Sequence, residues 1–192
     1  MKADVLSFRS NDESQPIRTA AWIVIVTTAT IALSVNFACA TPLAAVAALA
    51  GSHMKRHEGA WLVLTAWLAN QLVGYYLLHY PRTWDSFAWG AAIGIASLLA
   101  ALGARGAAQT TRSPVLSSLT AFLVAFLIYE GALFAATAVL PSSAAAFSLP
   151  VIARILGINA CAAVGLAAIH WLAVRIGLQP RRFAEHVALS HG

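Results

Sequence analysis

The chain has few charged residues and few cysteines, and each of these low counts excludes a class of protein. Only 10% of its 192 residues are Asp, Glu, Lys or Arg, whereas 60% are hydrophobic. A water-soluble domain of this length could not bury so much apolar surface, so we expect an integral membrane protein. The two cysteines, Cys39 and Cys161, lie in apolar surroundings. Two such residues do not form the framework of a disulfide-stabilised domain.

Nucleotide-binding motifs are also missing. The sequence has no glycine-rich phosphate loop, which excludes ATP hydrolysis by this chain. Its twelve basic residues outnumber its seven acidic ones, but they fall at the ends of apolar segments and not in a patch interleaved with aromatic residues. We therefore predict no nucleic-acid partner and no cofactor, and we interpret the basic residues as determinants of membrane topology.

Apolar runs predict an all-α bundle of six transmembrane segments. Five long runs cover residues 20–37, 60–78, 87–104, 115–140 and 149–176, and a short one covers residues 41–50. Ten helical residues span roughly 15 Å, half of the hydrocarbon thickness. The short segment is therefore expected to be a half-helix, a re-entrant piece, or the second limb of a helix kinked at Pro42.

The distribution of charge predicts the topology. With six segments and both termini cytoplasmic, ten of the twelve Lys and Arg residues lie on the inner side, whereas five crossings give a split of seven to five. The expected layout is a transmembrane domain at residues 19–178 of a bacterial-type inner membrane, with cytoplasmic tails at 1–18 and 179–192. A cleaved signal ending at Ala38-Cys39-Ala40 is the alternative for the N-terminal segment, and acidic residues before the apolar run oppose it.

Glu130 is a lone carboxylate inside the apolar run 123–134. Such a group is costly in hydrocarbon unless it faces a partner, a cavity or a substrate. Amides at similar depth accompany it, and together they predict a substrate cavity that opens outward: Asn36, Asn70, Gln71 and Asn159. Two alternatives are an ion pair between Glu130 and Arg154, and amides that bond one helix to another. Trp67, Asn70, Gln71 and Gly74 are expected to share one inward helix face.

Residues 75–89, the predicted outer turn between the third and fourth segments, are rich in rings. The candidate ligand contacts there are Tyr76, His79, Trp84 and Trp89, which could stack on a flat ligand. The alternative is an aromatic belt at the membrane interface, with Arg82 paired to Asp85 across the turn.

Histidine and cysteine give weaker signals for metal chemistry. His53 and His57 have i, i+4 spacing but lie beside Lys55 and Arg56, so a solvated loop is predicted and no metal site. His170 is expected to be packed and hydrogen-bonded on the inner half of the last segment. Cys39 lies near Pro42 at the outer break, where a thiolate could meet the metal of a ligand.

The layout resembles the substrate-binding S components of energy-coupling-factor vitamin transporters. The likeness rests on the chain length, the six hydrophobic segments, the aromatic outer turn and an Ala-x-x-x-Ala face at Ala44 and Ala48. It implies a vitamin or cofactor bound at the outer face and a small-residue helix face that docks a transmembrane coupling subunit and its ATPases. In cobalamin-type members a cysteine contacts cobalt, and Cys39 would be its counterpart.

The leading hypothesis is therefore a membrane-embedded protein for binding or uptake of a small molecule. One alternative is a membrane enzyme or redox protein that uses Glu130 and His170. Their predicted depths, in opposite halves of the bilayer, count against it. Another is an accessory subunit whose small-residue faces pack against a larger complex.

Overall fold

The computed structural model describes residues 16–32 and 41–177, and over these ranges the chain is helical without strands. The elements are the helix Pro16–Ala32, α2 (Leu43–His53), α3 (Arg56–Leu72) with a π-helical turn at Val73–Leu77, α4 (Trp84–Ala108), α5 (Pro114–Ala136), a 3-10 turn at Ala144–Phe147 and α6 (Leu149–Arg175). The all-α prediction is confirmed for these residues. The described part of the first helix includes Pro16, four residues before the predicted apolar run at residue 20.

Three of the helices suit a bilayer by length and composition. They are α4, α5 and α6, with 25, 23 and 27 residues, each on the order of 35 to 40 Å long. The helix Pro16–Ala32 and α2 are apolar but shorter. These features indicate a membrane protein.

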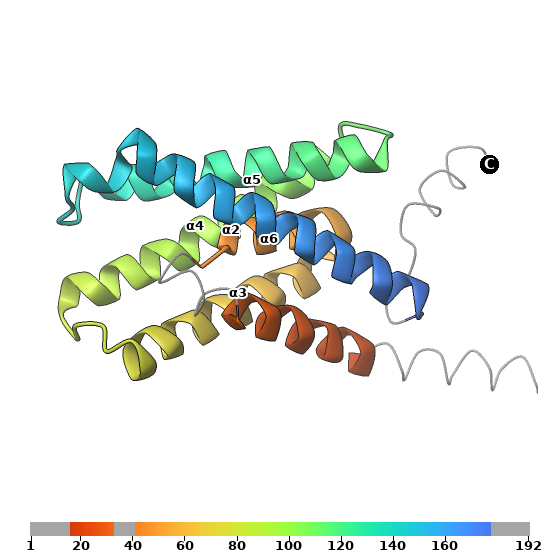
Figure 1. Cartoon of the computed structure of the whole chain (residues 1–192), viewed down its shortest axis with the longest axis horizontal. Coiled ribbons are helices and arrows are strands. Elements are labelled where there is room, and N and C mark those ends of the chain that lie inside the picture. The colour runs from red at the N-terminus through yellow and green to blue at the C-terminus, as the bar shows by residue number, and fades with distance from the viewer. Residues whose placement is uncertain (1–15, 33–40, 178–192) are drawn as a thin grey trace, which may run out of the picture.

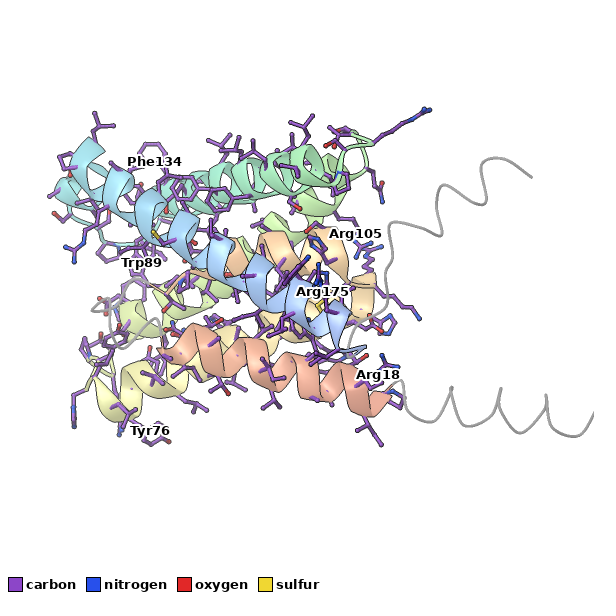
Figure 2. All side chains as sticks on the ribbon, turned by 45° about the vertical axis from the view of Figure 1, so that its right-hand side comes forward. Arg18, Tyr76, Trp89, Arg105, Phe134 and Arg175 are labelled. Carbon is purple, nitrogen blue, oxygen red and sulfur yellow. The ribbon has the colours of Figure 1, made fainter. Side chains whose placement is uncertain are left out.

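The bundle has two chemically different ends. Arg18, Arg105 and Arg175 gather at one, the basic end, whereas Tyr76, Trp89 and Phe134 lie at the other, the aromatic end (Figure 2). The helices α4, α5 and α6 alternate in direction between these ends, because each is joined to the next by a short connection.

The short helix α2 forms the core of the bundle (Figure 1). Nine of its eleven residues are buried, and it contacts α3, α4, α5 and α6. Its alanines let these helices approach closely. Gly51 has a tighter constraint, because a Cβ atom there would lie 2.8 Å from the Arg105 backbone nitrogen. The short second segment is thus an internal helix.

The Ala44–Ala48 face is used inside the chain. Ala44 is fully buried and Ala48 is 5% exposed, both within the cluster that α2 forms with its neighbours. The chain's own helices cover this face. The small residues that suggested a docking surface therefore serve the chain's own close packing.

Candidate functional site

Asn159 joins α6 to the beginning of α2. Its side-chain oxygen accepts a hydrogen bond from the Ala45 backbone N–H at 3.1 Å, and its amide nitrogen donates to the Ile155 carbonyl at 3.0 Å. The residue is 1% exposed. Because α2 starts at Leu43 without a side-chain cap of its own, Asn159 supplies one from another helix. This arrangement gives a structural role to a residue predicted to bind substrate.

The amides of α3 also contact neighbouring segments. Thr41 donates a hydrogen bond to the Asn70 side-chain oxygen, and the Trp67 indole donates to the Gly90 carbonyl at 2.8 Å. Gln71 lies against Gly90, where a Cβ atom would collide with its amide. The predicted inward face of α3 is thus directed at α4 and at Thr41, two residues before α2 begins. Close packing and hydrogen bonds occupy it.

The aromatic side chains of the turn at residues 75–89 either contact neighbouring groups or are exposed. The Trp89 indole donates to the Pro141 carbonyl at 2.9 Å, and the Arg82 guanidinium lies 5.9 Å from the centre of the Tyr76 ring. Tyr76 and Trp84 are each 68% exposed, and His79 is exposed with a φ of 55°. No ion pair joins Arg82 to Asp85 in the described part of the turn. The arrangement matches an interfacial belt.

Glu130 has one carboxylate oxygen, Oε1, that is buried without a hydrogen-bond partner among the residues described. Arg154, its predicted partner, is exposed, and no ion pair joins the two side chains over the ranges that the structure covers. Glu130 therefore stays a candidate for contact with a ligand or with another protein.

Two predicted site residues, Asn36 and Cys39, lie outside the described residues. The cobalt contact suggested for Cys39 is therefore not placed here. Cys161, the other cysteine, is a free thiol on the exposed surface of α6.

A groove of about 310 Å³ lies between α2, α5 and α6. It exists because α6 starts beside α5 at the aromatic end and then crosses α2 toward the helix Pro16–Ala32 (Figure 1). Apolar side chains line most of it, and three polar residues, Ser52, His53 and Ser118, lie at the basic end of its walls. The full lining comprises Ala45, Ala48, Leu49, Ser52, His53, Ser118, Leu119, Phe122, Ala160, Ala163, Val164 and Ala167.

A histidine pair stands at this polar end of the groove. The ring centres of His53 and His170 are 4.4 Å apart, and the centre of the Trp22 ring lies 5.6 Å from that of His170. The His170 Nδ1 and Trp22 Nε1 atoms are buried without hydrogen-bond partners in the described structure. Buried polar atoms usually have a hydrogen-bond partner, so these two atoms mark a candidate place for polar recognition.

The sequence interpretation missed this pair. His53 was predicted to lie in a solvated loop, but it is the last residue of α2 and is half-buried. His57 is exposed on α3, as expected of a solvated residue, and the described residues hold no group of three potential metal ligands. His170 is packed as predicted, and its Nδ1 has no hydrogen-bond partner among the described residues. The matching depth of residues 53 and 170, both near the basic end, was the available signal.

An apolar groove with hydrogen-bonding groups at one end can hold a molecule with an apolar body and a polar head. No family model, curated protein or solved structure matches the chain. The chemistry of the groove is thus the basis for a functional assignment.

Proposed function

We propose that this chain is a multi-pass protein of a bacterial-type inner membrane that binds a small amphipathic molecule in the groove between α2, α5 and α6, as a binding or uptake protein. Six segments with both termini cytoplasmic would put the basic end, with Arg18, Arg105 and Arg175, on the cytoplasmic side. The observation that carries the proposal is the groove itself, apolar along its length and polar at one end.

The size of the groove limits its ligand. A volume of about 310 Å³ is at the low end of the range for small-molecule sites, roughly 300 to 1,000 Å³. It suits one compact molecule or one hydrocarbon chain. The groove belongs to the basic half of the bundle, whereas the sequence predicted a polar and aromatic cavity in the outer half.

A role as the substrate-binding subunit of a vitamin transporter is a narrower version of this proposal. It requires a docking surface for a coupling subunit, and the Ala44–Ala48 face is buried by the chain's own helices. Exposed faces of α5 or α6 would have to serve instead. Isolation of the chain with a coupling subunit and ATPases from its native membrane would support that version.

The enzyme alternative gains no support from the geometry. Glu130 lies near the aromatic end of α5 and His170 near the basic end of α6. Counted along the helices, they are on the order of 15 Å apart in depth. Groups so distant cannot act on one reacting atom.

Filling the groove tests the proposal. Ala167 lines the groove, whereas Ala168, the next residue of α6, is also exposed but does not line it. We expect native mass spectrometry of the protein, released from nanodiscs, to detect a bound small molecule in the wild type and in Ala168→Phe but not in Ala167→Phe. A wild-type protein without any bound mass, or equal occupancy in both variants, would contradict the proposal.

A further inference from the structure

Ser52 determines which ring nitrogen of His53, the histidine that borders the groove, carries the proton. The Ser52 hydroxyl lies 2.6 Å from the Ala48 carbonyl oxygen and 2.6 Å from His53 Nδ1. A carbonyl can only accept, and a hydroxyl has one proton to donate. For the neutral ring, both short contacts are satisfied when Ser52 donates to Ala48 and His53 Nδ1–H donates to Ser52. His53 is thereby held as the Nδ1–H tautomer.

This tautomer leaves a lone pair on His53 Nε2. His53 lines the groove, and its ring also makes a hydrogen bond with the Leu49 carbonyl, a further acceptor for the ring N–H. Its neighbour His170 is packed against it ring to ring, at 4.4 Å between centres. The polar end of the groove therefore presents an acceptor to whatever occupies it.

We infer that the ligand of the groove carries a hydrogen-bond donor on its head, a hydroxyl or an N–H, and that His53 Nε2 accepts that hydrogen bond. The inference rests on the proposed binding function of the groove. The apolar walls at Ala160, Ala163 and Val164 take the ligand's hydrocarbon part. A head group made of acceptors alone, such as a carboxylate or an ether, would place lone pairs against Nε2 and is disfavoured.

The first test measures the tautomer without any ligand. Nitrogen-15 NMR of imidazole rings separates protonated from unprotonated ring nitrogens, and the chain has six histidines, so His53→Gln assigns the relevant pair of signals. We expect a protonated Nδ1 and an unprotonated Nε2 for His53 in nanodiscs, and a mixed pattern in Ser52→Ala. A protonated Nε2 in the wild type would overturn the inference.

The second test compares three probes whose hydrocarbon tails are of similar length: 1-decanol, decyl methyl ether and decanoate. Partitioning into empty nanodiscs is measured for each, so that affinities refer to the concentration in the lipid. We expect 1-decanol to shift the His53 Nε2 signal and to bind about tenfold more tightly than the other two, the effect of one hydrogen bond gained or lost. Ala167→Phe should abolish binding, and Ala168→Phe should not.

The outcomes separate the two claims. Equal binding of the alcohol and the ether, with no change at Nε2, would overturn the inference about the head group and leave the groove as a binding site. Decanoate binding as tightly as 1-decanol would overturn it too. If none of the probes binds the wild type, the proposed function fails and the inference fails with it.

Discussion

The two sides of α2 differ in how closely they are packed. On the side facing α4, a Cβ atom at Gly51 would lie 2.5 Å from the Ala101 carbonyl oxygen and 2.8 Å from the Arg105 nitrogen. On the side facing α5 and α6, the same helix borders a groove of about 310 Å³. A single buried helix thus serves both as the packing centre of the bundle and as one wall of its candidate site. Rigid packing on one side is what positions the wall on the other.

The largest effect is expected from Gly51→Ala. The added methyl group would collide with the backbone of α4, which cannot move as a flexible side chain would. We expect a loss of about 3 kcal/mol in the free energy of unfolding, the upper range for overpacking. Denaturant titration in detergent measures it.

Gly157→Ala is the matched control for this change. Nothing lies within 4 Å of a Cβ atom at Gly157, so alanine there should be neutral, or stabilising by up to about 1 kcal/mol through helix propensity. Similar losses for both variants would contradict the close approach of α2 and α4.

Asn159→Leu should have the next largest effect. The variant removes the acceptor of the Ala45 N–H at the beginning of α2. We expect a loss of about 1 to 2 kcal/mol, because a buried donor is left unsatisfied. The same unfolding titration applies, with Cys161→Ala, an exposed site two residues further on, as the control. Equal stability of the two variants would show that α2 does not depend on this cap.

The close-packed side of α2, which faces α4, could be predicted from the sequence better than the open side, which faces α5 and α6. The small residues at 44–51 predicted close helix contacts, and the amides at 70 and 159 had interhelical bonding as a stated alternative. Those inferences depend on residue type and spacing. The groove depends on the angle at which α6 crosses α2, which is set by all packed side chains together. His53 was misplaced because its loop or helix state depends on whether α2 continues through Gly51 and Ser52.

Ala163→Val tests the open side and should have a smaller effect. Because Ala163 lines the groove, two added methyl groups have room there. We expect the free energy of unfolding to stay within about 1 kcal/mol of the wild type. It should rise if the added methyl groups are buried in the groove. Both Ala163→Val and Gly51→Ala enlarge a small residue, but we expect their changes in the free energy of unfolding to differ in sign or in magnitude. A loss as large as that of Gly51→Ala would mean that the groove is filled by the protein itself.

Glu130→Gln should have the smallest effect on the isolated chain. The Glu130 Oε1 atom has no partner in the described residues, so the substitution removes no hydrogen bond or ion pair that this structure contains. We expect a change of less than about 0.5 kcal/mol in the free energy of unfolding, measured beside Asn159→Leu. A loss above about 1 kcal/mol would instead place Glu130 with Asn159, among polar groups that bond one part of the chain to another. A stable variant that no longer associates with a partner protein would assign the carboxylate to an interface, because a charge in hydrocarbon is retained where something pairs with it.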